Sequence, residues 1–488
     1  MPERLATLPN RLRIRPRLLA VRDRAASGWP RSFGTGVLTW VALVAVAAVT
    51  GVAVTTSGKI GLAVAAFVLV VGIFVADPVL LAVIALPAAL VLVRVGGSST
   101  NLSTADLVVF VAGVASLFRV RWRDARYLKQ FLQGIVWYEA VLLLVVLVNP
   151  NQYDIIEWFH RLSYVGASAL VGWMIATSGR LRPAFRAFLY GASLLAVAAM
   201  LVALATHFQP AQFGLYQKNA IGDIMWVAVA VCQINPPWLG VSRREARVCK
   251  YLCIGGLLAS YSRQGVIVLI LALIVAVLRN PEVRRQSKLM LLGVIPLAAA
   301  VYYSFSYAAR TNPKFNSVSI RVGQLQAAFH VWHMSPLFGE GMHFYDLPQF
   351  ITVTAPPNVL LDNLASTGIV GSLAFFYLVY ITVRTLLRVP AAFGTLGLAI
   401  LVAHYVDGLF DIFWIGASSA IPFIICGVCL GMADAQRRAV DPSGGLERAP
   451  ARGPTTEDGL GVPRVRPAAR ASASSPAGRR AGPAAPAW

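Results

Sequence analysis

The sequence predicts an all-α polytopic membrane protein, with about 14 transmembrane helices and one long, ordered outer-face loop that contains short helices. Composition is the first reason for this prediction. Of the 488 residues, 57% are hydrophobic and 13% are charged, whereas soluble domains hold about 45–50% apolar and about 25% charged residues. The second reason is that long apolar runs recur between residues 36 and 432. The third is the uneven distribution of positive charge between these runs.

The apolar runs that we interpret as membrane spans are separated by short polar joints. Several are shorter than the ~20 residues that a perpendicular helix needs, so their boundaries hold to within a few residues. In chain order the spans are 36–54, 60–76, 78–94, 105–118, 131–148, 161–177, 184–206, 219–237, 250–261, 264–278, 288–304, 364–387, 391–406 and 412–432.

Lysine and arginine fall mostly on one side of these spans. If the joints alternate between the two faces, 35 of the 43 Lys and Arg residues lie on one side and eight on the other. The side rich in positive charge is the cytoplasmic one, so both termini are predicted to be cytoplasmic. The net charge of +22 then reflects membrane orientation, and nucleic acid is not an expected partner.

Three regions follow from this topology. Residues 1–35 are predicted to form a basic cytoplasmic arm, which either lies near anionic lipid or is a plain solvated tail. Residues 36–432 form the transmembrane domain, which includes an extracytoplasmic loop at 305–361. Residues 433–488 are rich in Ala, Pro, Gly, Ser and Arg. Because they cannot bury enough apolar surface to fold, they are predicted to be a disordered cytoplasmic tail.

The loop at 305–361 is predicted to be ordered and to close over a site at the outer membrane face. Aromatic residues recur through it, which is typical of a functional loop rather than a linker. One apolar face at helical spacing predicts a helix that lies on the membrane or on the spans. The residues of this face are Val318, Val322, Leu325, Phe329 and Trp332.

Proline, glycine and asparagine residues indicate where the remaining helices and turns of the loop begin and end. Pro336 ends the predicted helix, and the run from Gly339 to Gly341 is typical of a tight turn. Asn358 is a candidate N-cap for a short helix that follows. Gly368 and Gly371 are predicted to let the next span pack closely.

Four cations on the predicted outer face oppose the orientation bias, and so need another explanation. They are Arg161, Lys218, Arg263 and Arg321. A ring of cations at the level of the lipid headgroups suits an anionic group such as a phosphate or pyrophosphate, which arginine binds through a planar fork of donors. The alternative for each single residue is a side chain that extends to the headgroups.

Two further pairs of polar residues suggest other sites. Glu139 and Asp223 lie inside predicted spans, where an acid indicates either a proton path or one interhelical hydrogen bond. His330 and His333 are spaced to share a metal ion, but no further ligand pattern supports this. No metal and no cofactor are therefore expected.

Four stretches of this chain resemble sequence motifs of the O-antigen ligase and O-antigen polymerase superfamily, whose members are bacterial membrane glycosyltransferases of the GT-C type. They are Phe213–Gly222 with its Lys-Asn pair, Ser262–Gly265, Arg321 with Trp332 and the run Ser335–Gly341, and Asn358–Leu364 leading to Thr367–Gly371. Together they cover residues 213–371. The family commonly has histidine before the asparagine, where this chain has Pro357.

The resemblance implies transfer of a glycan from an undecaprenyl-pyrophosphate carrier at the outer face of the cytoplasmic membrane, with inversion and without a metal. It implies that Arg263 and Arg321 bind the pyrophosphate and that Arg161 and Lys218 assist them. The candidate bases are His333, His343, Asp362 and Glu340. Further substrate contacts are expected from Asn219, Asn358 and Glu340.

The acceptor stays open between two alternatives. A polymerase adds the growing chain to another lipid-linked repeat unit, whereas a ligase moves a finished glycan to a lipid, protein or wall acceptor. The absence of the histidine at Pro357 favours the polymerase. A flippase or a chain-length regulator would be a further partner. The rival from another class is a non-enzymatic polysaccharide transporter, which predicts charged residues deep in several spans or two matching halves.

Overall fold

The computed structural model describes residues 72–73, 77–92, 103–283, 296, 299, 303, 317–350, 356, 358–411 and 419–440. The chain divides into two units, Met1–Val440 and Asp441–Trp488, and all the described residues belong to the first. The predicted arm at 1–35, the span at 36–54, nearly all of the spans at 60–76 and 288–304, the position of Pro357 and most of the predicted tail lie outside the described residues.

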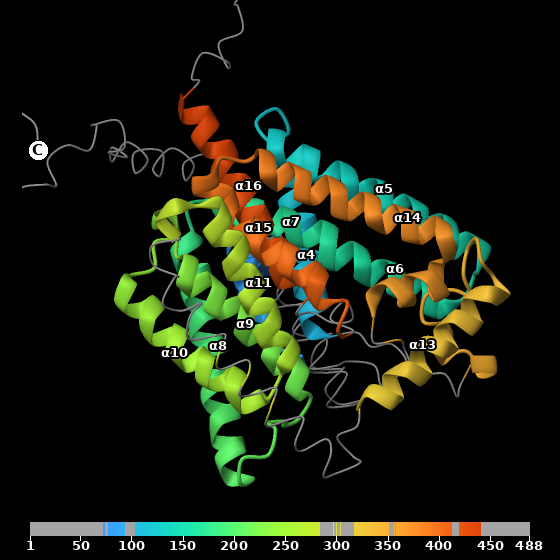
Figure 1. Ribbon diagram of the computed structural model, residues 1–488. Coiled ribbons are helices and arrows are strands. Elements are labelled where there is room, and N and C mark those ends of the chain that lie inside the picture. The colour runs from blue at the N-terminus through green and yellow to red at the C-terminus, as the bar shows by residue number, and fades with distance from the viewer. Residues whose placement is uncertain are drawn as a thin grey trace, which may run out of the picture. The chain divides into compact units, whose positions relative to one another are not determined.

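Helices make up the regular structure of the described residues (Figure 1). In chain order they are α3 (Pro78–Ala88), α4 (Thr104–Arg119), α5 (Arg126–Val148), α6 (Gln152–Arg161), the π-helix η3 (Leu162–Ala167), α7 (Ser168–Thr177), α8 (Leu181–Ala205), α9 (Lys218–Ile234), the short η4 (Pro237–Leu239), α10 (Arg243–Ser260), α11 (Arg263–Arg279), α13 (Ser317–Met334), the short turns η6 (Phe344–Asp346) and η7 (Pro348–Phe350), α14 (Val359–Arg388), α15 (Ala391–Asp407) and α16 (Ala420–Val440).

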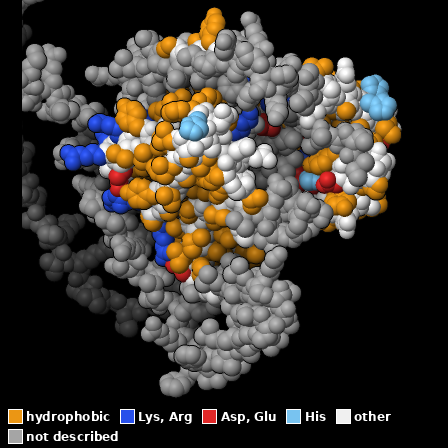
Figure 2. All heavy atoms as spheres, turned by 90° about the horizontal axis from the view of Figure 1, so that it is seen from below, with side chains coloured by type: hydrophobic (Ala, Val, Ile, Leu, Met, Phe, Trp, Pro, Cys, Tyr) orange, Lys and Arg blue, Asp and Glu red, His pale blue; other side chains and the backbone are white. Residues whose placement is uncertain are grey.

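Four of these helices are long and apolar enough to cross a membrane, namely α5, α8, α14 and α16, while α3 and α15 are shorter apolar helices. The all-helical class predicted from the sequence is confirmed over the described residues, but the expected number of about 14 spans is not. Figure 2 shows hydrophobic side chains over much of the described face, with several Lys and Arg side chains at its left margin. An apolar exterior with cations at its edge is typical of a surface in contact with lipid.

Helix caps move some boundaries away from the predicted spans. The span predicted at 250–261 lies in α10, which begins earlier, at Arg243. The reason is a capping box: the Ser242 hydroxyl accepts the N–H of Glu245 (3.2 Å), and the Glu245 carboxylate accepts the N–H of Ser242 (2.9 Å). The predicted joint between α10 and α11 is confirmed, with Tyr261 in the left-handed conformation and Ser262 capping α11.

Small residues let α16 pack directly on α7. A Cβ at Gly172 would collide with the backbone of α16, and a Cβ at Gly427 would collide with the backbone of α7. Such close approach of backbones is how helices associate in lipid. At the other end of α16, the buried Asp434 accepts the N–H of Tyr127 (3.1 Å) at the start of α5. This contact caps a helix that has no side-chain cap of its own.

The long helix α14 is broken at Gly368, whose φ of 63° and ψ of −162° are not helical. The segment Pro336–Gly341, which we call the clamp segment, fills the break, and a Cβ at Gly368 would collide with the Leu337 carbonyl. Four backbone hydrogen bonds join the two: Glu340 N–H to Ala365 O (3.0 Å), Gly341 N–H to Ser366 O (3.0 Å), Ile369 N–H to Pro336 O (3.0 Å) and Val370 N–H to Leu337 O (3.1 Å).

Two expectations for the loop need correction. Gly368 breaks its helix and does not only ease helix packing, and α14 already begins at Val359, because Asn358 accepts the N–H of Leu360 (2.9 Å) and caps it as predicted. In α13, Val322 and Phe329 of the predicted apolar face are exposed. The packed side instead carries Ala328 and Val331, buried against η6, η7 and α14. The amphipathic period therefore predicted the helix but not which side would be covered.

We predict that Gly368→Ala weakens the fold by roughly 2–4 kcal/mol, because it forces an L-residue into a glycine conformation and pushes a methyl group into the clamp segment. The matched control is Gly323→Ala in α13, where a Cβ meets nothing within 4 Å and where alanine favours the helix. Thermal unfolding of the two purified variants in detergent measures the difference. Equal melting temperatures would contradict the role assigned to the break.

Candidate functional site

The starts of α9 and α11 are packed against each other. Gly222 in the second turn of α9 faces the Ser262 side chain, so closely that a Cβ there would collide with it. A Cβ at Gly265 would lie 3.2 Å from the Gly222 carbonyl oxygen. Both glycines come from stretches that carry the family resemblance. Their contact brings together two helix N-termini, the ends where the N–H groups and the helix dipole favour an anion.

Each of these N-termini carries a cation, because α9 begins at Lys218 and α11 at Arg263. Arg321, from the first turns of α13, is close enough to act on the same group. Burial lowers the pKa of the Lys218 ammonium, and the positive charges of Arg263 and Arg321 lower it further, while Asp411 opposes them. The charges of Arg263 and Arg321, two cations predicted from the sequence, therefore both act on a third, Lys218. We call Lys218, Arg263 and Arg321 the cation cluster.

Two acids accompany the cation cluster. The Asn219 side chain donates a hydrogen bond to the Asp411 carboxylate, just after the end of α15. Asp223 lies one turn further along α9 and accepts a hydrogen bond from the Gln264 side chain of α11 (3.3 Å). Asp223 therefore makes an interhelical hydrogen bond, which was one of its two expected roles, and it also lies beside the carboxyl of Asp407 at the end of α15. A pocket of about 180 Å³ opens beside Arg263 in the α10–α11 joint, lined by Leu257, Leu258, Tyr261, Ser262 and Val266.

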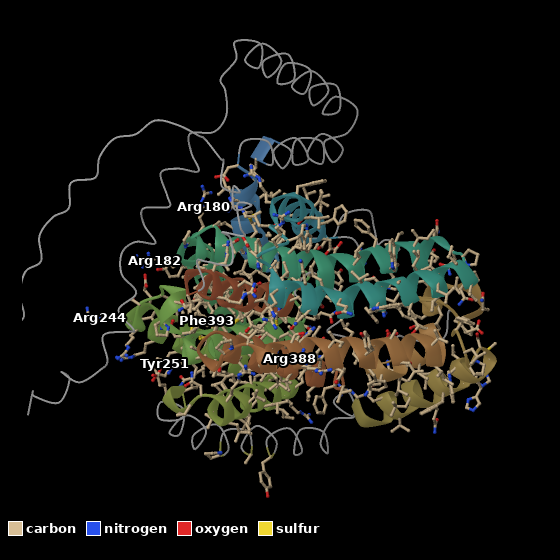
Figure 3. The ribbon with its side chains drawn as sticks, turned by 90° about the horizontal axis from the view of Figure 1, so that it is seen from above. Arg180, Arg182, Arg244, Tyr251, Arg388 and Phe393 are labelled. Carbon is tan, nitrogen blue, oxygen red and sulfur yellow. The ribbon has the colours of Figure 1, made fainter. Side chains whose placement is uncertain are left out.

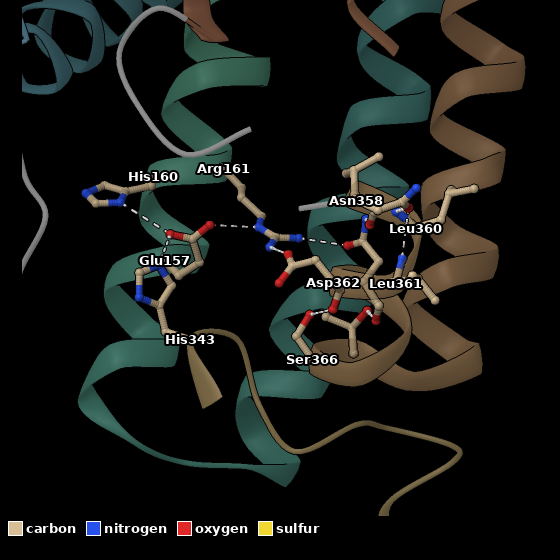
Figure 4. A network of polar contacts seen from close by, with 12 residues as sticks. Glu157, His160, Arg161, His343, Asn358, Leu360, Leu361, Asp362 and Ser366 are labelled. Atoms are coloured by element: carbon tan, nitrogen blue, oxygen red, sulfur yellow. Dashed lines mark hydrogen bonds and ion pairs between the residues drawn. The ribbon is translucent and has the colours of Figure 1, made fainter. Parts of the chain in front are cut away.

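Arg161 does not join the cation cluster but lies in a buried polar network (Figure 4). Its guanidinium donates to four acceptors: Glu157 (3.0 Å), the Tyr138 hydroxyl (3.1 Å), the Asn363 side chain (2.9 Å) and Asp362 (3.5 Å). These come from α6, α5 and α14. A buried cation with this many acceptors is satisfied within the protein, so in this structure Arg161 joins three helices.

His343 extends the network into the loop. Its Nε2 lies 3.0 Å from the Glu157 carboxylate and its Nδ1 lies 3.1 Å from Asp346. Burial alone would lower the pKa of His343, but the charge of Glu157 and then that of Asp346 raise it to about 9. Burial would likewise raise the pKa of Glu157, but contacts with His343, His160 and Arg161 bring it well below its usual range. This pair is therefore charged at neutral pH and ties the loop to α6.

The other predicted site residues are spread around these two groups. Asp362 is buried beside Arg161, and Asn358 uses its side chain to cap α14 and to donate to the Leu409 carbonyl (3.0 Å). Glu340 lies in the clamp segment, half-buried. His333 is exposed at the end of α13, where its Nδ1 faces the Phe329 carbonyl (2.6 Å).

Sequence reasoning did not single out Glu157 or Asp411. Glu157 precedes Arg161 by one helical turn, a spacing that stabilises opposite charges on a helix, so this pair could have been found. Asp411 had no local signal, because its partner Asn219 is distant in the chain. Only the packing of α9 against the end of α15 brings the two together.

We predict a pH-dependent effect for His343→Gln. Because the folded-state pKa of His343 is raised, the stability it contributes is complete below its usual value of about 6.5 and is lost as the pH rises through 9. The variant should unfold on the order of 3 kcal/mol more easily near pH 6 and resemble the wild type near pH 10. Melting temperatures across this range give the measurement, with exposed His333→Gln as control. A loss that does not change with pH would refute the ion pair.

Residues 249–376 match the family described as O-antigen ligase. The matched segment runs from α10 into α14, and so contains Arg263, Arg321, the clamp segment and Gly368. No curated protein matches the chain. The matched segment carries α11 and α13, two of the three helices that bear the cation cluster, together with the whole clamp contact. The expected resemblance to the O-antigen ligase and polymerase superfamily is confirmed for residues 249–376.

Proposed function

We propose that this protein is a membrane glycosyltransferase that polymerises lipid-linked oligosaccharide repeat units into a cell-surface polysaccharide, with undecaprenyl pyrophosphate as the carrier. The observation that carries the proposal is the cation cluster, where two helix N-termini and the charges of Lys218, Arg263 and Arg321 meet. The O-antigen ligase match over residues 249–376 supports glycan transfer in polysaccharide assembly.

The cluster suits the chemistry of this transfer. A hydroxyl of the acceptor sugar attacks the anomeric carbon, the bond from that carbon to the pyrophosphate oxygen breaks, and the bonding electrons leave with the pyrophosphate. A single displacement inverts the anomeric carbon. Because negative charge grows on the leaving oxygen, fixed cations and helix N–H groups lower the barrier most. Arg263 and Arg321 donate paired hydrogen bonds to the phosphate oxygens, and Lys218 adds a third positive charge.

The acceptor hydroxyl loses its proton, and we propose Asp411 as the group that takes it. Its carboxylate lies beside Lys218 and is held by Asn219, so it is positioned at the cluster. The earlier candidates His343 and Asp362 are less suited. His343 already carries its proton between two carboxylates, and Asp362 is buried in an ion pair with Arg161, so neither is well placed to accept another proton.

The anchoring residues have a supporting role in this scheme. Arg161, Glu157 and His343 hold the loop against α6, and the clamp segment holds it against α14. In this scheme the loop holds Arg321 close enough to Lys218 for the two charges to interact. We propose that the site opens at the outer face, in keeping with the excess of Lys and Arg predicted on the opposite side.

The second candidate is transfer of a finished glycan by a ligase, which the description of the matched family favours. The two reactions share the donor and the leaving group, and differ only in the acceptor. Proline at 357 in place of the family's histidine favours the polymerase. Product analysis in cells separates them, because a polymerase mutant accumulates single repeats and a ligase mutant keeps long chains on the carrier.

We predict that Arg263→Ala and Arg321→Ala each lower polymer formation in cells by roughly 100-fold to 1,000-fold, the usual cost of one group that stabilises developing charge. Replacement of either by Lys should keep part of the activity, because the charge is retained but the fork is lost. Arg388→Ala is the control, since Arg388 is exposed at the end of α14. Polymer length on gels, at matched protein levels, gives the measurement. Normal polymer in both alanine variants would exclude polymerase and ligase alike.

We further predict that Asp411→Asn lowers the rate by roughly 100-fold or more, the usual contribution of a base, without loss of donor binding. Asp411→Glu should retain more activity than Asp411→Asn, because it keeps the carboxylate. Turnover and donor affinity of the purified protein, measured separately, give the test. A variant in which only donor affinity falls would assign Asp411 to binding instead of proton transfer.

A further inference from the structure

A second cavity lies far from the cation cluster, between α8 and α10. It is a groove of about 560 Å³, within the usual range of about 300–1,000 Å³ for ligand sites. The helices run parallel here: Glu245 contacts Arg186 near both helix starts, and a Cβ at Gly256, further along α10, would collide with Ala196. The groove therefore lies near the starts of α8 and α10, the end of the helices opposite the cation cluster.

The walls of the groove are apolar and its mouth is polar. Leu194 and Val197 of α8 face Val248 and Leu252 of α10. Leu194 is 72% exposed and Val248 is 60% exposed, so these side chains form an open apolar channel. At the polar end stand Tyr190, Arg244 and Glu245. An open apolar channel with a polar mouth suits an amphiphile better than a soluble metabolite.

The polar end carries net positive charge. Both oxygens of Glu245 have partners, since one accepts from Arg186 and the Tyr190 hydroxyl (3.1 Å) and the other from the Ser242 N–H (2.9 Å). Arg244, by contrast, extends from the start of α10 as an exposed side chain. Figure 3 shows Arg244 along the margin of the molecule that also carries Arg180 and Arg182.

The position of this charge points to an anionic partner. Arg243, Arg244 and Arg247 all lie in the first two turns of α10, where positive charge is unfavourable because the helix dipole already makes that end positive. The orientation rule explains why cations occur at this end of the helices. It does not explain why Arg244 lines an apolar groove. A bound phosphate would compensate both Arg244 and the dipole.

We propose that this groove binds one anionic phospholipid from the membrane leaflet at this end of the helices. An acyl chain lies along Leu194, Val197 and Val248, and the phosphate pairs with Arg244. Basic pockets between transmembrane helices on the cytoplasmic side are suited to such lipids. The site is independent of glycan transfer, since it shares no residue with the cation cluster.

The test uses the full chain purified in detergent, with phosphatidylglycerol and phosphatidylcholine as probes. Native mass spectrometry counts the lipids that stay bound, and melting temperatures report the effect on the fold. We expect phosphatidylglycerol to be retained and to raise the melting temperature by several degrees, with little effect of phosphatidylcholine. Arg244→Gln should lose at least tenfold in affinity for phosphatidylglycerol. Arg388→Gln, which removes an exposed arginine outside the groove, should bind as the wild type does.

A second variant tests the groove itself. Val197→Trp fills the channel without changing charge, and should lose the bound lipid even though Arg244 is intact. Equal retention of the two lipids by the wild type would overturn the proposal. So would a phosphatidylglycerol affinity unchanged by either Arg244→Gln or Val197→Trp. If Val197→Trp instead converts a dimer to a monomer, a second copy of the chain occupies the groove and the lipid assignment is wrong.

Discussion

The backbone contact between the clamp segment and the break in α14 is the interaction on which the loop depends. A helix broken inside an apolar environment leaves N–H and C=O groups without partners, and each costs several kcal/mol away from water. Here the Pro336–Gly341 backbone supplies the missing partners through four hydrogen bonds. Gly368 makes room for them. The loop is therefore packed into the helix bundle through these hydrogen bonds and does not merely cover its surface.

The contact between the clamp segment and α14 positions the buried network around Arg161 and the cation cluster at the same end of the helices. The part of α14 before the break carries Asp362 and Asn363 to Arg161, and so to the buried network around Glu157. The Asn358 cap of the same helix donates to Leu409, next to Asp411. A change at the break should thus reach the network and the cation cluster alike, even though Gly368 touches neither.

The two polar groups differ in how their charges are balanced. In the buried network, Arg161 and His343 face carboxylates, so the charges are compensated inside the protein. In the cation cluster, the charges of Arg263 and Arg321 lower the pKa of Lys218, and Asp411 opposes them. An anionic ligand would relieve this repulsion. That contrast separates a group that holds the loop in place from a group suited to bind a diphosphate.

Composition and apolar periodicity determined the helical class, the approximate places of most helices and the residue types able to bind an anion. Local signals also found the cap at Asn358 and the turn at Gly339, because caps and turns depend on neighbours in the chain. Only the tertiary structure decided that Arg161 is buried among acids while Lys218, Arg263 and Arg321 meet. The sequence gives the charge of each side chain, but its hydrogen-bond and ion-pair partners come from helices that are distant in the chain. The same holds for Gly368, whose break is stable only because the clamp segment supplies hydrogen bonds from outside the helix.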